Sequence, residues 1–251
     1  MAIKIPKELQ FLVNDLRKPQ PCTTRMDGKT CVIAGATSGV GYESALALAK
    51  AGAQIVIIAR NPEKADKLVK AIKSINNHNS HVYFADFTKI QSVRDAINKL
   101  INEVPRIDVL INSVGIFNTR KELIDNYEKN FYVSHLSTHL LVKMLIPKLK
   151  ESAPSRIIHV NSEGHRFGGL WLKNLNWKNR PYIGLRAYGA AKIAQIYCMR
   201  EFNKELKKSK VTINCMHPGA VKTNIGNNNG FLYRFWLHKV MWLTMKTPDI
   251  S

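Results

Sequence analysis

Acidic residues are scarce in this chain of 251 residues, where 18 Asp and Glu stand against 38 Lys and Arg and the formal charge is +20 at pH 7. Such a field attracts phosphates, nucleic acid and acidic lipid alike, and it selects none of them. The lysines are spread over predicted helix faces, and no zinc-finger, RNP or similar nucleic-acid motif is present. We therefore interpret the charge as solvated surface and expect no nucleic-acid partner.

Cysteine is equally sparse. The four cysteines lie far apart, with no CxxC pair and no histidine at zinc-ligand spacing. We expect no metal site. We also expect an intracellular, reducing compartment, either the cytoplasm or the surface of a membrane.

Long apolar runs are missing near the start. Charged residues interrupt every apolar stretch of MAIKIPKELQFLVNDLRKPQP, so we expect neither a signal peptide nor a membrane-spanning helix there. A short amphipathic stretch and a proline-rich passage predict an arm over residues 1–27. One domain, over residues 28–251, is expected to follow.

Strand and helix patterns alternate along that domain. Helices are predicted at 41–52, 62–75, 90–102, 122–145 and 186–206, and they separate six short strands at 30–35, 54–59, 81–84, 108–112, 156–161 and 211–216. This alternation predicts the α/β class, with a single Rossmann-type, doubly wound parallel sheet that carries helices on both faces.

A glycine-rich turn, AGATSGVG at 34–41, joins the first strand to the first helix. Glycines let the backbone approach a pyrophosphate, and a helix N-terminus offers free amides and a positive dipole end. The pattern alone is weak, but here both flanks fit. It predicts a dinucleotide-binding turn made by Gly35, Thr37, Ser38, Gly39, Val40 and Gly41.

The second strand is followed by Arg60, where a fold that prefers NAD places an acid for the ribose 2′-hydroxyl. A guanidinium cannot accept that hydrogen bond, but it can pair with a 2′-phosphate, and Ser38 can add a hydroxyl donor. The alternative is a solvated residue at a strand end. Because no acid stands nearby, we favour NADP(H) as the cofactor.

From about Lys29 to Thr247 the chain resembles the short-chain dehydrogenase/reductase family, because several motifs occur in the family's order. The glycine turn is the first, with Ala34 where the family usually has threonine. Asp86, beside Phe87, matches the acid that usually faces adenine. The segment NSVG, with Asn112, Val114 and Gly115, corresponds to the family's NNAG.

The most specific element is Tyr188-Gly-Ala-Ala-Lys192, which follows Ser162 at the end of the fifth strand. Tyr188 and Lys192, four residues apart, share one helix face, so the ammonium can lie near the phenol. A phenol titrates near ~10 in isolation, and a positive neighbour favours its anion. A tyrosine on an amphipathic helix alone more often packs, but Ser162, Asn130 and the glycine turn in order indicate an active site.

The resemblance implies a role for each residue. Tyr188 would be the general acid or base, Ser162 would stabilise the substrate oxygen, and Lys192 would lower the Tyr188 pKa and bind the nicotinamide ribose. Asn130, in YEKNFYVSH, matches the family's asparagine that holds a relay water; the alternative is a polar residue on a helix surface. In HPGAVKT, the residues expected against nicotinamide are Pro218, Gly219, Val221 and Thr223.

The long segment between Ser162 and Tyr188, together with SEGH, HPG and WLTMKTP, resembles the branch that contains retinol dehydrogenases and related lipid or xenobiotic carbonyl reductases. An apolar carbonyl or alcohol substrate is therefore implied. Trp171, Leu172, Leu175 and Trp177 would wall its pocket or, equally, pack the inserted loop.

Two expectations concern the C-terminal part. The family pattern continues past Ser251 with a helix and a last strand, so we expect this chain to lack them, which leaves open the substrate pocket and the contacts of a homo-oligomer. Residues 231–250 interleave aromatics with cations, which suits a substrate lid or a helix in a membrane interface; we favour the lid.

A rival function is a non-catalytic NADP(H)-binding sensor or interaction module, but Ser162, Tyr188 and Lys192 weigh against it.

Overall fold

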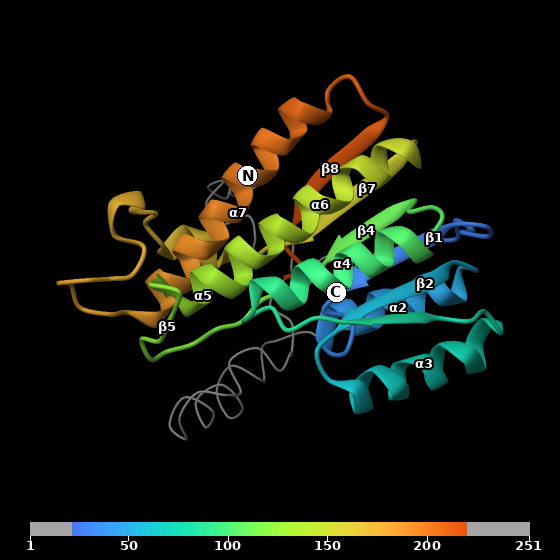
Figure 1. Cartoon of the computed structure of the whole chain (residues 1–251), viewed down its shortest axis with the longest axis horizontal. Helices are drawn as coiled ribbons and strands as arrows, with labels where there is room; N and C mark the ends of the chain where they lie inside the picture. The colour runs from blue at the N-terminus through green and yellow to red at the C-terminus, as the bar shows by residue number, and fades with distance from the viewer. Residues whose placement is uncertain (1–21, 220–251) are drawn as a thin grey trace, which may run out of the picture.

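The computed structural model describes residues 22–219, and six parallel strands form its central sheet (Figure 1). They are β1 (Thr30–Ala34), β2 (Gln54–Ala59), β3 (His81–Phe84), β4 (Val109–Asn112), β7 (Ser155–Val160) and β8 (Val211–Met216). Their spatial order is β3-β2-β1-β4-β7-β8, so the winding reverses between β1 and β4. The predicted doubly wound sheet is confirmed, and such a reversal point is where these folds bind ligands.

Helices cover both faces of the sheet. Side chains of β1 alternate between two buried cores, as the period of two in a strand requires. Ile33 packs with α2 (Gly39–Lys50) and α3 (Pro62–Asn76). Val32 belongs to the core beneath α4 (Ile90–Glu103), α6 (Ser137–Glu151) and α7 (Gly184–Leu206), three helices that lie on one side of the sheet in Figure 1.

The helix predicted at 122–145 begins later than expected, so that part of the prediction is wrong. A hairpin of β5 (Leu123–Ile124) and β6 (Tyr127–Glu128) precedes it. Asp125 and Asn126 form its turn with φ values of 47° and 64°, a left-handed conformation that these two residue types tolerate. The helix then runs through α5 (Lys129–Phe131), the π-helix η2 (Tyr132–Leu136) and α6.

The long segment before α7 contains two short 3-10 helices, η3 (Glu163–Phe167) and η4 (Leu172–Asn174). Trp177 is buried, and the Arg180 guanidinium carbon lies 3.6 Å from its ring centroid. Trp171 and Leu172, in contrast, are 52% and 70% exposed. Trp177 thus packs the loop, whereas Trp171 and Leu172 face outward.

The first residue of α7 is pressed against the chain that follows β4. A methyl group at Gly184 would lie 2.7 Å from the carbonyl oxygen of Asn118 and 2.7 Å from Cα of Thr119. No side chain fits there. The start of the helix that carries Tyr188 is therefore held directly by backbone contact.

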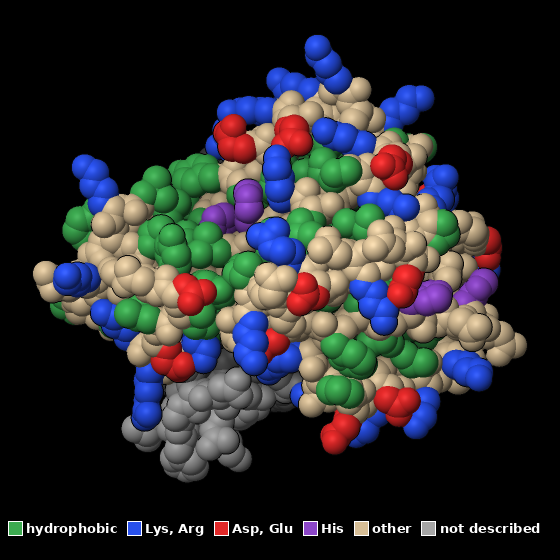
Figure 2. Space-filling view, viewed as in Figure 1, with side chains coloured by type: hydrophobic (Ala, Val, Ile, Leu, Met, Phe, Trp, Pro, Cys, Tyr) green, Lys and Arg blue, Asp and Glu red, His purple; other side chains and the backbone are tan. Residues whose placement is uncertain are grey.

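In Figure 2, Lys and Arg side chains are spread over the visible face among acidic and apolar ones. Among the helices of residues 22–219, none is long and apolar enough to cross a membrane. The segment 231–250, for which we predicted a lid, and the site residues Val221 and Thr223 lie outside the described residues.

Candidate active site

The turn between β1 and α2 leaves no room for a side chain at two of its glycines. Gly35 has a φ of +79°, and a methyl group on it would lie 2.9 Å from the carbonyl carbon of Ser113. A methyl group on Gly41 would collide with the carbonyl oxygen of Gly35. Ser38 is the N-cap of α2 and its side chain makes no capping hydrogen bond, so the first amides of the helix remain to bind an anion. The cradle therefore fits a dinucleotide phosphate.

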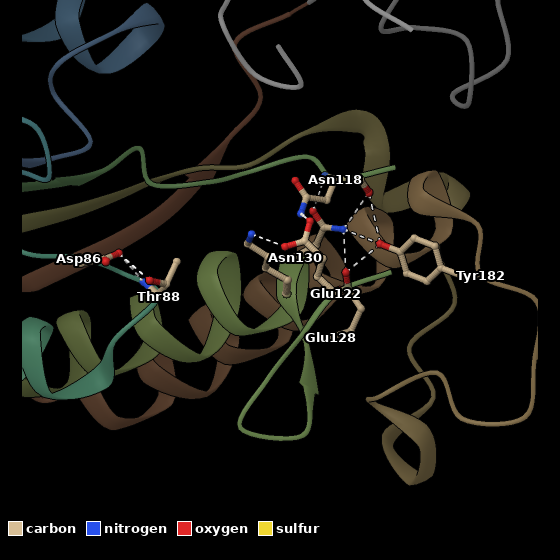
Figure 3. Close-up of polar contacts among 8 residues, drawn as sticks. Asp86, Thr88, Asn118, Glu122, Glu128, Asn130 and Tyr182 are labelled. Carbon is tan, nitrogen blue, oxygen red and sulfur yellow. Dashed lines mark hydrogen bonds and ion pairs between the residues drawn. The ribbon is translucent and has the colours of Figure 1, made fainter. Parts of the chain in front are cut away.

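Arg60 and Asp86 follow β2 and β3 at this same edge of the sheet. Partial burial alone would raise the Asp86 pKa, but hydrogen bonds from Thr88 and the charges of Arg60 and Lys89 hold the pKa below its usual value. The Thr88 hydroxyl donates to Oδ1 of Asp86 at 2.8 Å (Figure 3). Asp86 is therefore a fixed anion near the exposed guanidinium of Arg60.

The end of β4 forms the floor of the site. Asn112 is fully buried; its Nδ2 lies 3.0 Å from Nδ1 of His159, and its Oδ1 accepts from the amide of Val114 at 3.2 Å. A methyl group on Gly115 would lie 3.5 Å from Nζ of Lys192. This segment thus lies between the glycine turn, which Ser113 contacts, and Lys192 on α7.

Ser162 and Tyr188 meet around Gly164. A methyl group built on this glycine would lie 3.3 Å from Oγ of Ser162 and 2.6 Å from Cε1 of Tyr188. The Tyr188 ring is buried, and Phe117 meets it edge-on with a centroid separation of 5.2 Å. Oγ of Ser162 accepts from the amide of Gly164 at 3.0 Å.

Lys192 is 3% exposed, an unusual position for an ammonium. Burial lowers its pKa to about 8. Its Nζ donates to the carbonyl oxygen of Val160 at 3.3 Å and lies 5.6 Å from the ring centroid of Tyr188. The structure therefore brings Ser162, Tyr188 and Lys192 together. Pro218 and Gly219, with a φ of +86° at the glycine, follow β8 at the same edge.

Asn130, for which the resemblance implies a water-holding role, is fully buried and is therefore not a helix-surface residue. Its Oδ1 accepts from the amide of Asn118 at 2.8 Å, and its Nδ2 donates to Oε1 of Glu128 at 2.8 Å and to the Tyr182 hydroxyl at 3.0 Å. Glu128 is fully buried, and burial raises its pKa. Figure 3 shows these side chains pointing toward one another. Asn130 thus ties the chain after β4 to the loop before α7, and the two protons of its amide are engaged there.

Ser134, which the sequence did not single out, and Lys192 both approach Gly115. A methyl group on Gly115 would lie 3.8 Å from Oγ of Ser134 and 3.5 Å from Nζ of Lys192. That hydroxyl accepts from the amide of Ile116 at 3.2 Å. The π-helix η2 adds a residue to the helical turn, and such turns often mark functional sites, but no spacing in the sequence reveals one.

A sheet that reverses beside β1, a tightly packed glycine turn at a helix N-terminus and a Ser-Tyr-Lys group at the same edge define a dinucleotide-binding oxidoreductase. Within residues 22–219, no group of three or more His, Cys, Asp or Glu side chains is placed to hold a metal ion.

Comparison with known proteins gives the family. The short chain dehydrogenase family model matches residues 29–230. Retinol dehydrogenase 13 of Homo sapiens is 34% identical over 237 residues, covering 92% of this chain and 72% of that protein. Retinol dehydrogenase 11 of Homo sapiens is 34% identical over 230 residues, covering 90% of this chain and 71% of that protein. The chain belongs to the short-chain dehydrogenase family, which confirms the resemblance and its retinol dehydrogenase-like branch.

Solved structures agree on the fold. A short-chain dehydrogenase of Shigella flexneri 2a, complexed with NADP, superposes with a TM-score of 0.72 at 18% identity, over 91% of this chain and 89% of that one. A protein from Mycobacterium paratuberculosis superposes with a TM-score of 0.67 at 27% identity, over 78% and 70% of the two chains.

Proposed function

We propose that this protein is an NADP(H)-dependent oxidoreductase that transfers a hydride between nicotinamide and the carbonyl or alcohol carbon of an apolar substrate. The observation that carries the proposal is the meeting of Ser162, Tyr188 and the buried Lys192 at the sheet edge where the glycine turn lies. A sensor or interaction module would need none of these three side chains in contact.

When bound, the cofactor supplies or accepts the hydride at C4 of its nicotinamide ring. Tyr188 gives the proton of its hydroxyl to the substrate oxygen in reduction and removes it in alcohol oxidation. The amide of Gly164 donates to Oγ of Ser162, so the Ser162 hydroxyl keeps its own proton for the same substrate oxygen. Lys192 favours the Tyr188 anion by its charge, and a pKa of about 8 leaves it mostly protonated at pH 7.

Arg60 supports NADP(H) over NAD(H). Its side chain is exposed directly after β2, and its charge helps to lower the pKa of Asp86 beside it. A guanidinium in this position pairs with a 2′-phosphate, whereas Asp86 is already held by Thr88. In this proposal Gly35, Thr37, Ser38, Gly39, Val40 and Gly41 bind the pyrophosphate.

An apolar substrate is supported by the relatives and by the loop before α7. The similar human proteins are named retinol dehydrogenases. Trp171 and Leu172 are exposed on that loop, while Phe117 packs against the Tyr188 ring. A retinoid-, steroid- or xenobiotic-like carbonyl or alcohol is therefore the class we propose.

The full-length protein and its Tyr188→Phe variant test the proposal. Retinoid, steroid and aromatic carbonyls are supplied with NADPH or NADH, and the matching alcohols with the oxidised cofactors, while cofactor absorbance is followed. We expect parent turnover with NADPH and loss of turnover in Tyr188→Phe, which still binds NADPH in a fluorescence titration. A parent that binds NADPH but turns over no member of the panel would favour the sensor alternative.

A further inference from the structure

Gln195 lies three residues after Lys192 on α7 and is 1% exposed. Its Nε2 donates to the carbonyl oxygen of Ser134 on η2. Its Oε1 accepts from Nδ2 of Asn161 at 3.4 Å. A buried amide is costly unless it is hydrogen-bonded, and an apolar side chain would fill the same volume without that cost. The amide therefore calls for a reason other than core packing.

Asn161 extends the same set of contacts to the other catalytic residues. Its side chain is 7% exposed, its Nδ2 donates to the backbone oxygen of Lys192 at 3.1 Å, and its Oδ1 accepts from the amide of Ser162 at 2.7 Å. Asn161 and Gln195, the amide pair, thus connect three separate elements: η2 with Ser134, α7 with Lys192, and the end of β7 with Ser162.

We propose that the amide pair consists of positioning residues, which set the Ser162 hydroxyl against Lys192 and Tyr188. The inference rests on the proposed function of those three residues. Ser162 follows a strand and Tyr188 stands on a helix, so nothing in either element alone fixes the gap between them. Hydrogen bonds from two buried amides do fix it, and a misplacement of about 1 Å in such a site costs up to ~100-fold in rate.

The fold should tolerate the loss of Gln195, because its hydrogen-bond partners Ser134 and Asn161 each keep a second contact. The neighbouring His159 ring keeps its contact with Asn112. The Thr138 hydroxyl donates to the carbonyl oxygen of Ser134 at 2.6 Å, and Nδ2 of Asn161 keeps its hydrogen bond to the backbone carbonyl oxygen of Lys192. A Gln195→Met variant therefore removes the amide at nearly constant volume without leaving the Ser134 carbonyl unpaired.

The first test measures Gln195→Met with NADPH and a carbonyl substrate that the parent reduces. We expect kcat per folded protein to fall between about ten- and a hundredfold, while the Kd for NADPH stays within twofold. Gln91→Met is the matched control, because Gln91 also donates its amide, to Asp95 at 2.7 Å, but on the exposed side of α4. It should leave kcat unchanged.

The second test uses Gln195→Glu, which is decisive even if the methionine variant fails to fold. A neutral carboxylic acid can still donate to the Ser134 oxygen, whereas a carboxylate cannot. Activity of this variant should therefore rise as the pH falls, through an ionisation that the parent profile lacks. His159 and Lys192 are the titratable groups beside this position, so the ionisation of the introduced carboxyl is located by a direct titration of the variant. A kcat equal to the parent's at a pH where this carboxyl is ionised, or a kcat of Gln195→Met within twofold of the parent, overturns the inference. A parent without turnover instead overturns the proposed function.

Discussion

Gly164 lies directly against the ring of Tyr188: a methyl group at this glycine would be 2.6 Å from Cε1 and 2.8 Å from Cδ1. A Gly164→Ala substitution must therefore push the ring away from Ser162, or move the loop that carries Ser162. We expect kcat to fall at least about tenfold. Stopped-flow or steady-state reduction assays measure this change.

Gly169→Ala is its matched control, since a methyl group there meets no atom within 4 Å. The control should keep the parent rate. If the two alanine variants are equally active, contact between Gly164 and Tyr188 has no part in catalysis.

Replacement of Arg60 should change cofactor preference. Arg60→Asp puts an acceptor for a ribose hydroxyl where a phosphate partner stood, and it repels a 2′-phosphate. The ratio of kcat/KM with NADPH to that with NADH should fall at least about tenfold, or ~1.4 kcal/mol. Arg200→Asp makes the same charge change on an exposed position of α7 and should leave the ratio as it is. A parent that already prefers NADH contradicts the assignment.

The buried ammonium of Lys192 should lower the free energy of unfolding at neutral pH. Burial lowers its folded-state pKa to about 8 from an ordinary lysine value of 10.5, so the folded state holds the proton less tightly than the unfolded state does. The cost is fully present below pH 8 and disappears as the pH rises through the interval from 8 to 10.5. Lys192→Met should thus abolish turnover and raise the free energy of unfolding at pH 7 by roughly 1 to 3 kcal/mol.

Urea unfolding at pH 7 and pH 10 measures the effect, and the gain should shrink at the higher pH. An equal gain at both values would mean that the burial of the ammonium is not its cause.

Asn130 and Ser134 should respond differently to alanine. Asn130→Ala removes an amide donor from both the buried Glu128 carboxyl and the Tyr182 hydroxyl, which still donates to Glu128 itself at 2.8 Å, so we expect a loss of about 1 to 3 kcal/mol of stability. Ser134→Ala removes a hydroxyl near Lys192 and should lower kcat more than stability. Thermal unfolding and kcat, measured for both variants, show which of the two residues serves stability and which serves turnover. If Asn130→Ala loses kcat at full stability and Ser134→Ala loses none, then Asn130 has the relay role that the family resemblance gave it.

Most of the fold follows from local patterns. The strand, glycine turn and helix at residues 30–50 occur as the sequence indicates, and the four-residue spacing fixes Tyr188 and Lys192 on one helix face whatever surrounds them. The group around Asn130 was not predictable, because its partners Asn118 and Tyr182 lie 12 and 52 residues away. The contact of Gln195 with Ser134, 61 residues apart, likewise depends on the π-helix and on the packing of α7.

The contact of Gly184 with Asn118 and Thr119 has a consequence for how this protein can diverge. Because the start of α7 is anchored by backbone to the chain after β4, insertions, deletions or substitutions in the stretch from Gly169 to Ile183 need not shift Tyr188. If the proposed function holds, this stretch can change its substrate contacts while Tyr188 keeps its position for proton transfer. Gly184 itself should tolerate little change, because any side chain there would meet the backbone of Asn118 and Thr119.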